Sequence, residues 1–429
     1  MATVAPFRGI HFDPLRVDLA RSISPPYDVI SQAEAARLRA ASPANIVRLI
    51  LPDQDIGGYE RAAQFLRNCL TAGEMLQDPA PSLYAYQQRF VHPTLPDRRM
   101  TRLTLFVALR LEPYSSGIVL PHEETHPKAK ADRLELMRAS GANPEPIYGL
   151  YEDPGRELAS SLSAAAGEPL LEAETDDGQV HTIHRYDNAE LVHRICAFFQ
   201  DRGIWIADGH HRYETALNYQ KERNLSGEHG NKPYDFILIG LTAFEDPGIV
   251  VLATHRLVRN IPAPRMEQLT LSLQRYFEVR VMPTARARQW LRERVPGETR
   301  IVTARKDSSL ALQLRSYDAV AAAVEAGHSP AWVHLDVTVL QSLVLDRTLG
   351  ISWAELAHTP NVVYTRDEEE ALDKVACGEF QLACLLQDPE VAEVREVAQA
   401  GDRMPQKSTF FYPKLWSGLI LRSVQDQAL

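Results

Sequence analysis

The sequence contains few cysteines, and they form no motif. Four cysteines are present in 429 residues, and none of them belongs to a CxxC pair. Thiols scattered in this way are typical of free, mostly buried side chains in a reducing cytoplasm. The chain also lacks a basic start followed by an apolar core, and no window approaches about 18 uncharged apolar residues. These absences predict a cytoplasmic protein that does not insert into a membrane.

Positive charge is scarce as well. The chain has 46 Lys and Arg against 56 Asp and Glu, a formal net charge of −10. Broad contact with nucleic acid requires a basic surface, and no helix-turn-helix candidate with a basic face is evident. The P-loop pattern GxxxxGK[ST] is absent, and so are internal repeats and low-complexity segments. We therefore expect no nucleic-acid partner.

What is present is the composition of an ordinary soluble protein. Apolar residues make up 45% of the chain and charged residues 24%, which is typical of globular domains. A chain of this length has room for about two or three domains with separate cores. The pattern of elements changes near Asn260. We therefore predict an α/β (α+β) protein with one domain over residues 1–260 and a second α/β domain over residues 261–429.

Hydrophobic periodicity predicts the elements of the first domain. Ser31 is placed to cap one helix and Asn188 to cap another. The segment of residues 24–28 contains two consecutive prolines and cannot be helical. Residues 83–91 and 101–111 have the pattern of two hairpin strands joined by a polar loop. The remaining predicted elements are a helix at 59–76 and strands at 146–151, 179–186, 235–241 and 249–253.

In the second predicted domain, helices and short strands alternate. A strand-helix-strand unit is predicted over residues 361–386, and a later helix is predicted to end at Gly401. The other predicted elements are helices at 264–276, 285–293, 318–326 and 333–345, and strands at 278–282, 299–304 and 309–314.

The stretch with the most possible chemistry is residues 203–218, GIWIADGHHRYETALN. Its apolar run predicts a buried strand, the Asp-Gly pair at 208–209 predicts a tight turn, and a helix follows. A helix that starts after such a turn presents backbone N–H groups and a positive dipole end to an anion. His210, His211 and Arg212 lie in its first turn, and arginine binds phosphate oxygens bidentately. The stretch predicts a phosphate site; alternatively, these side chains only solvate the start of the helix.

The run DGHHRYETA resembles the phosphate-binding segment of the ParB/sulfiredoxin superfamily, in which a turn and a His-Arg or Arg-Arg pair hold nucleotide phosphates. More closely, ADGHHRYETAL resembles the signature of a bacterial family known as domain of unknown function 1015, whose members are often labelled ParB-like. The resemblance extends along nearly the whole chain. It also includes PFRGIHFDP at 6–14, SPPYDVIS at 24–31, the segment 122–134 and MPQKSTFFYPKL at 404–415.

The resemblance implies a fold but does not supply a reaction, because function depends on sites. It implies a ParB/sulfiredoxin-like nucleotide-binding core in residues 1–260. Sulfiredoxin carries its reactive cysteine directly before the His-Arg pair, whereas this chain has His210 there. Since that chemistry needs a thiol nucleophile, sulfiredoxin activity is not expected.

The HEETH segment at residues 122–126 matches the metalloprotease pattern HExxH, which requires both histidines on one face of a continuous helix. A proline directly follows the segment, so a zinc protease is not expected. The resemblance implies a different motif, with His126 incidental. That motif consists of His122, Glu123, Thr125, Lys130, Asp132 and Arg133. Glu123, Lys130 and Asp132 would then serve a magnesium ion and a phosphate; the alternative is a solvated loop.

Asp28 follows two prolines, in a loop rigid enough to aim a carboxylate. Its side chain could instead only stabilise a turn. In the free-serine kinases that the superfamily resembles, an acidic residue near the start of the chain acts on the substrate hydroxyl. The resemblance therefore implies that Asp28 is a general base.

Two further groups are candidates for binding. One group ends a predicted apolar strand, where α/β proteins tend to expose ligand groups; it consists of Thr254, His255 and Arg256. Alternatively, the histidine caps the strand and the arginine pairs with a carboxylate. The other group flanks three consecutive aromatic residues, which are more often core than binding platform, and consists of Lys407, Ser408 and Lys414. An alternative to a core role is that this C-terminal motif returns to the phosphate site, where these three side chains could reach phosphate or substrate.

These residues predict a nucleotide-dependent kinase for a small hydroxyl compound, with free L-serine as the best guess by analogy with the serine kinases. Asp208, Gly209 and the His-His-Arg cluster would bind ATP or ADP, with CTP as an alternative. His211 and Arg212 would neutralise the transferred phosphate, and Glu123, Asp132 or Asp208 would hold Mg²⁺. A homodimer is a further option. Two other functions stay open: a ParB-like nucleotide-binding switch and a metal-dependent hydrolase.

Overall fold

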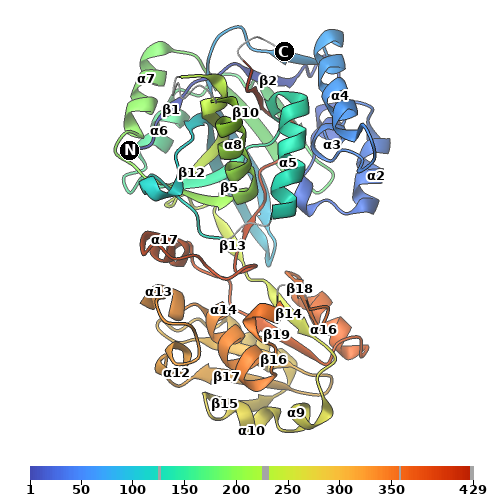
Figure 1. Ribbon diagram of the computed structural model, residues 1–429, viewed down its shortest axis with the longest axis vertical. Helices are drawn as coiled ribbons and strands as arrows, with labels where there is room; N and C mark the ends of the chain where they lie inside the picture. The colour runs from blue at the N-terminus through green and yellow to red at the C-terminus, as the bar shows by residue number, and fades with distance from the viewer. Residues whose placement is uncertain (124–126, 225–230, 357–358, 426–429) are drawn as a thin grey trace. The chain divides into compact units, whose positions relative to one another are not determined.

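The chain leaves its first structural unit once and returns to it near the end. The structure, a computed structural model, describes residues 1–123, 127–224, 231–356 and 359–425 of a mixed α/β protein. Unit 1 comprises Met1–Val250 and Pro413–Leu429, and unit 2 comprises Val251–Tyr412 (Figure 1). The units thus differ from the two ranges expected from the sequence at residues 251–260 and 413–429. Periodicity identifies elements but does not indicate that a distant C-terminal segment rejoins the first sheet.

A long hairpin forms the middle of the main sheet of unit 1. Its strands are β4 (Leu83–His92) and β5 (Leu95–Arg110). The sequence predicted a polar loop between residues 91 and 101, and this prediction was wrong because β5 begins directly after a two-residue turn. The register shifts between Val91 and His92, so residues 96–98 form a bulge. A bulge accommodates Pro96, because a bulged residue does not have to donate a backbone N–H to the partner strand.

Three strands beside this hairpin carry the candidate site. They are β8 (Ile147–Tyr151), β11 (Ile204–Asp208) and β12 (Phe236–Ala243). Nearly all of their residues are buried, as their apolar runs predicted. Helices α5 (Pro127–Ser140) and α8 (His210–Arg223) lie side by side over this part of the sheet (Figure 1). The predicted strand, turn and helix at residues 203–218 are therefore confirmed.

The main sheet has the strand order β6-β11-β8-β12-β5-β4-β10-β9, and β1 pairs with β5. β11 is antiparallel to β8, and β8 is parallel to β12. The remaining strands of this sheet are β1 (Val4–Ala5), β6 (Val119–Leu120), β9 (Leu171–Glu174) and β10 (Val180–Tyr186).

A second, small sheet joins the two ends of the chain within unit 1. Its order is β3-β2-β21-β7, so the C-terminal strand β21 (Leu421–Ser423) lies between β2 (Gly9–Phe12) and β7 (Ala142–Asn143). The remaining strand is β3 (Met75–Gln77). Just before β21, Ser417 and Ser24 form a backbone bridge. The segment after residue 412 is therefore held beside the proline-rich segment predicted to carry a functional aspartate.

The predicted helix starts in unit 1 are confirmed by side-chain caps. Ser31 accepts the N–H of Glu34 at the start of α2 (Gln32–Ala41), and Asn188 caps α7 (Ala189–Phe198). The prediction for residues 24–28 was wrong at its end, because Tyr27–Val29 forms one 3₁₀ turn, η1. Pro26 itself is extended, so the turn begins only after the two prolines. The other helices are α1 (Leu19–Ser22), α3 (Val47–Ile50), α4 (Gly58–Ala72), α6 (Glu157–Ala164) and the 3₁₀ turns η2 (Tyr114–Ser116) and η3 (Pro233–Asp235).

Unit 2 contains an antiparallel sheet of order β15-β17-β16-β19-β14-β18. Its core includes Leu257, Val302 and Leu385, over which helices α11 (Thr284–Arg292) and α16 (Glu368–Ala376) pack. The strand-helix-strand prediction at 361–386 is confirmed. The strands are β14 (His255–Val258), β15 (Phe277–Met282), β16 (Arg300–Ala304), β17 (Ser309–Leu314), β18 (Val362–Thr365) and β19 (Leu382–Leu386). A separate two-stranded pair joins β13 (Val250–Leu252) and β20 (Phe410–Tyr412).

The helices of unit 2 are shorter than predicted. The predicted helix at 333–345 is interrupted at Leu335, whose backbone is extended, and it continues as the π-helical η4 (Leu340–Thr348). Periodicity predicts which face is buried but not the local breaks that caps introduce. The last predicted helix is confirmed as α17 (Val391–Gln399), followed by Gly401 at φ 76°. The other helices are α9 (Ala263–Glu267), α10 (Leu269–Leu273), α12 (Asp318–Ala321), α13 (Pro330–Val333), α14 (Asp336–Val339) and α15 (Trp353–Leu356).

None of the helices in the described part of the chain combines the length and the apolar character that a membrane crossing requires.

Candidate functional site

The turn between β11 and α8 has a geometry that only glycine adopts without strain. Gly209 has φ 90° and ψ 27°, in the left-handed region, and α8 begins at the next residue. A Cβ at Gly209 would lie 3.0 Å from both Nε and Nη2 of Arg212. The arginine side chain therefore folds back over the turn, in the space that the missing side chain leaves.

Arg212 is a buried cation held by two oxygens. Its Nη1 donates to the carbonyl of Pro146 at 2.7 Å, and its Nη2 donates to Oδ2 of Asp208 at 3.1 Å. Burial acts to lower the pKa of Arg212, but the charges of Glu145, Asp208 and Asp28 raise it. The guanidinium is therefore a fixed positive charge at the start of α8.

Lys414 supplies a second cation from the returning C-terminal segment. Its Nζ donates to Oδ1 of Asp208 at 2.7 Å. Burial acts to raise the pKa of Asp208, but Lys414 and Arg212 lower it to about 2. Asp208 is thus an ionised carboxylate between two cations.

Asp28, in η1, lies close enough to this cluster to interact with it electrostatically. The residue as a whole is exposed. Burial of its carboxyl group nevertheless raises the pKa of that group, and the charge of Asp208 raises it further. Lys414 and Arg212 act in the opposite direction. A carboxyl with a raised pKa beside two cations is suited to take a proton, and the role of Asp28 as a general base stays a prediction.

Glu145 connects three of the motifs and was missed in the sequence. It is 3% exposed, and its Oε1 accepts the N–H of Tyr27 and the hydroxyl of Ser417, both at 3.0 Å. Arg133 lies 3.7 Å from its other oxygen, and the guanidinium carbon of Arg133 lies 3.9 Å from the centroid of the Tyr27 ring. A carboxylate flanked by two prolines, in PEP at residues 144–146, was the signal that could have identified it.

The two histidines His122 and His210 contact each other edge to face, with ring centroids 4.7 Å apart. The N–H of His122 donates to Nε2 of His210 at 3.2 Å, and Nδ1 of His122 donates to the carbonyl of Ile206 at 2.6 Å. Burial lowers the pKa of His122, while the charge of Glu123 acts to raise it. Because Nε2 of His210 accepts a bond within the protein, any phosphate contact by this residue would use its other ring nitrogen. His211, the next residue, is partly exposed.

The HEETH segment does not continue a helix in its described part. His122 and Glu123 precede α5, which begins at Pro127, while Glu124, Thr125 and His126 lie outside the described residues. A metalloprotease pattern needs its first histidine inside the helix. Within the described ranges, moreover, no group of three or more His, Cys, Asp or Glu side chains is placed to hold a metal ion.

Lys130 and Asp132 of α5 are engaged in contacts between helices. Lys130 pairs with Glu214 of α8 at 2.8 Å. Asp132 accepts the hydroxyl of Tyr59 at 2.7 Å and a bond from Arg133 at 2.6 Å. Burial acts to raise the pKa of Asp132, but these partners lower it. Both residues therefore hold α5 against its neighbours, and metal ligation by Asp132, Glu123 and Asp208 stays a prediction.

The candidates Thr254, His255, Arg256, Lys407 and Ser408 belong to unit 2. There the two groups do come together, because fully buried Arg256 donates to the carbonyl of Thr254 and, at 3.2 Å, to that of Lys407. His255 accepts the N–H of Leu386 at 3.3 Å. Burial lowers the pKa of Arg256 to about 10. These contacts are structural within unit 2, and a binding role for the five residues stays a prediction.

The chain matches one family model, described as "Protein of unknown function (DUF1015)", over residues 4–338. No curated protein matches it. Among solved structures, one described as free serine kinase in complex with AMP has 15% identity and a TM-score of 0.36, over 72% of this chain and 86% of that chain. SbnI with a C-terminal truncation, from Staphylococcus aureus, has 10% identity and a TM-score of 0.37, over 75% and 90% of the two chains. A conserved hypothetical protein from Pyrococcus furiosus has 14% identity and a TM-score of 0.33, over 73% and 92%. TM-scores this low carry no inference about activity.

Proposed function

Because the chain belongs to the family of proteins of unknown function DUF1015, whose description names no activity, we propose a function from the site itself. The protein is a nucleotide-dependent kinase that phosphorylates a small hydroxyl compound. One observation supports this most strongly: Arg212 and Lys414, two hundred residues apart in the chain, both contact Asp208 at the N-terminus of a 14-residue helix. Asp28 lies within electrostatic range of all three.

Several features of the turn favour a phosphate as its ligand. The start of α8 carries the positive end of the helix dipole and the first backbone N–H groups, which have no acceptor inside the helix. The left-handed glycine leaves room for the Arg212 guanidinium over the turn. Arg212 and Lys414 add two cations, of which arginine suits bidentate contact with phosphate oxygens. The nucleotide is ATP or ADP, with CTP as the alternative.

The chemical step assigned to the site uses one base and two cations. Asp28 takes the proton of the acceptor hydroxyl as the acceptor oxygen bonds to the transferred phosphorus. The bond from that phosphorus to the leaving nucleotide oxygen breaks, and Arg212 and Lys414 stabilise the negative charge on the phosphoryl oxygens. Free L-serine is the proposed acceptor.

Magnesium fits this site only as an ion that arrives with the nucleotide. No ready group of three protein ligands is found among the described residues. Mg²⁺ in phosphoryl-transfer sites commonly uses one or two carboxylates together with substrate phosphates. Asp208 is the carboxylate at the turn that would hold it, and the ion would reduce the charge of the transferred group.

The direct test is product formation by the full chain with MgCl₂, L-serine, and ATP or ADP. We expect O-phosphoserine and the nucleotide with one phosphate fewer, identified by mass spectrometry. Asp28→Asn should lower kcat by about 10²–10⁴-fold, since the variant cannot accept a proton, with nucleotide affinity unchanged. The wild-type rate should fall as pH falls through the raised pKa of Asp28, because only the ionised carboxyl acts as base, and the variant should lack this fall.

Arg212→Gln should weaken nucleotide binding by about 10–100-fold in calorimetry, since it removes a charged donor. Lys221→Gln, an exposed cation on the same helix, is the matched control and should bind normally. Unchanged affinity of Arg212→Gln would rule out the phosphate turn. Tight nucleotide binding without any phosphorylated product would instead indicate a nucleotide-binding switch.

A further inference from the structure

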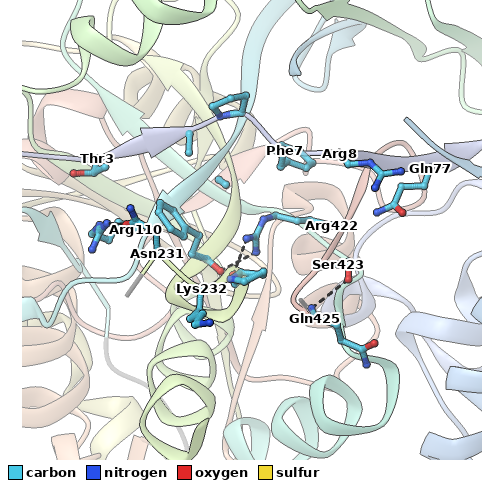
Figure 2. A pocket seen from close by; sticks show the side chains of 15 residues that line it. Thr3, Phe7, Arg8, Gln77, Arg110, Asn231, Lys232, Arg422, Ser423 and Gln425 are labelled. Carbon is cyan, nitrogen blue, oxygen red and sulfur yellow. Dashed lines mark hydrogen bonds between the residues drawn. The ribbon is translucent and has the colours of Figure 1, made fainter. Parts of the chain in front are cut away.

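Unit 1 contains a concave site that shares no residue with the phosphate turn. It is a pocket of about 520 Å³ beside β1 and the C-terminal end of β5 (Figure 2). This volume lies in the range of small-molecule pockets, about 300–1,000 Å³. The pocket is lined by Thr3, Ala5, Pro6, Phe7, Arg8, Gln77, Ala108, Arg110, Asn231, Lys232, Pro233, Phe236, Arg422, Ser423 and Gln425.

The charge of this pocket is opposite to that of the chain. Four cationic side chains line it, and the described residues of its lining include no Asp or Glu, although the chain carries a net charge of −10. None of the four forms an ion pair with any residue that the structure describes. They are Arg8, Arg110, Lys232 and Arg422. A group of cations without counter-charges attracts an anion.

Among these cations, Arg422 gives the strongest indication of an anion site because its side chain is buried, with 5% of the residue exposed. It donates to three oxygens that carry no full charge, the carbonyls of Phe236 at 2.9 Å and Pro233 at 2.7 Å and the amide oxygen of Asn143 at 3.3 Å. Its Nε is buried and has no hydrogen-bond partner among the residues that the structure describes. Burial lowers its pKa to about 10. A buried charge in this state is costly unless an anion pairs with it.

Part of the pocket lining is apolar, which a site for a bare inorganic ion would not require. Beyond Phe106, β5 pairs with β1 instead of β4, and the small residues Ala5 and Ala108 face each other in that pair. The Phe236 ring stands at the wall with the Arg110 guanidinium 5.2 Å from its centroid. Phe7 also lines the pocket (Figure 2). Space beside a ring and cations at the rim suit a ligand that has a ring and a charge.

We propose that this pocket binds a small aromatic or heteroaromatic anion, with the ring against Phe236 and the acidic group among Arg110, Lys232 and Arg422. The acidic group is a phosphate or a carboxylate, because both pair with guanidinium and ammonium groups. The ligand is a second one, bound in addition to the nucleotide of the proposed kinase site, and the two sites can be tested separately.

Isothermal titration of the full chain with phenyl phosphate tests the proposal, and benzoate tests the carboxylate form. We expect one of these two to bind, and inorganic phosphate and benzyl alcohol to bind at least about tenfold more weakly, since each lacks either the ring or the charge. Lys232→Glu, at an exposed position, should weaken binding by about tenfold. Ala108→Leu should abolish it by filling the floor, with circular dichroism as the check of folding.

Two control variants separate this pocket from other sites. Lys221→Glu makes the same charge change at an exposed position outside the pocket and should leave binding unchanged. Arg212→Gln should also leave it unchanged, whereas it should weaken nucleotide binding. The proposal is overturned if neither ring anion binds, if Lys232→Glu binds as tightly as wild type, or if only Arg212→Gln loses the ligand.

Discussion

At the scale of single residues, the site depends on carboxylates and cations that lie close to one another and are partly shielded from water. Asp208 is ionised because Lys414 and Arg212 both donate to it. Asp28 lies close to the same cations, which lower the pKa of its carboxyl. Burial and the neighbouring carboxylate of Asp208 raise this pKa by more, so it stays above its usual value. Two carboxyl groups at one site therefore have different basicities, which allows one to hold charge and the other to take a proton.

Gly209→Ala should damage both stability and binding. Alanine at φ 90° costs about 1–2 kcal/mol, and its Cβ would press on Arg212. The melting temperature should fall by a few degrees and nucleotide affinity should drop, as measured by calorimetry. Gly178→Ala is the matched control: Gly178 has φ 76°, but a Cβ added there would have open space around it, with nothing within 4 Å. It should show the loss of stability without the loss of affinity; equal affinities for the two variants would contradict the role of the arginine.

At the scale of elements, the site is completed by the end of the chain. The segment after Tyr412 brings Lys414 to Asp208, Ser417 to Glu145, and β21 to the strands β2 and β7. Trp416, between them, packs against His181 with ring centroids 4.6 Å apart. None of these contacts is local in sequence, so the element acts as a strap across unit 1 and sets the position of one cation of the site.

A chain that stops at Tyr412 should therefore lose both stability and nucleotide binding. We expect a decrease in the free energy of unfolding of more than about 2 kcal/mol, from lost strand pairing and packing, and no nucleotide binding. Ser417→Ala, which removes only the hydroxyl bond to Glu145, should cost about 1 kcal/mol and retain binding. Urea unfolding and calorimetry measure both. A truncated chain with wild-type stability would show that the strap is dispensable.

Two helices of unit 2 bring carboxyl groups together. Burial raises the pKa of Asp336 at the start of α14 to about 6, and burial together with Asp336 raises that of Glu393 on α17 to about 7. The folded state therefore binds more protons than the unfolded state between about pH 4 and 7. The stability that these protons confer is present below that range and is lost as pH rises through 7.

Glu393→Gln should reduce this pH dependence to the part that the burial of Asp336 contributes. The glutamine keeps an oxygen for the N–H of Glu390 but carries no charge. At pH 8 the variant should be more stable than wild type by about 1–3 kcal/mol, and at pH 5 the difference should shrink. Urea unfolding at both values measures it, with Glu396→Gln, exposed on the same helix, as the control. A difference that does not depend on pH would contradict the proposed protonation.

At the scale of the whole molecule, one unit is an insertion in the chain of the other. Unit 2 is a single continuous segment with its own sheet and apolar core, and its two ends are joined by the pairing of β13 with β20. Because β13 and β20 pair with each other, both termini of the excised segment would still be held by strand pairing.

Residues 250–412 expressed alone should therefore fold. We expect a cooperative thermal transition and a well-dispersed amide spectrum, because the core of this unit is made only of its own residues. A fragment that stays unfolded would show that unit 2 depends on unit 1 for its stability.

The sequence by itself determined the elements that carry the chemistry. Short-range signals were enough for the buried strand, the glycine turn and the helix start, since apolar runs, a left-handed glycine and side-chain caps all act within a few residues. For the same reason Ser31 and Asn188 were identified as caps. The wrong predictions, such as the loop between β4 and β5, occurred where pairing with a partner strand outweighed local preference.

Only the tertiary structure decided which of these elements meet. Lys414 was one of several basic candidates until the C-terminal return brought it to Asp208, and Glu145 gave no sign beyond its two neighbouring prolines. The cationic pocket is made from five separate stretches of chain, so no local pattern indicated it. Contacts between residues hundreds of positions apart depend on sheet order and on the path of the chain, and neither is contained in the periodicity of any one segment.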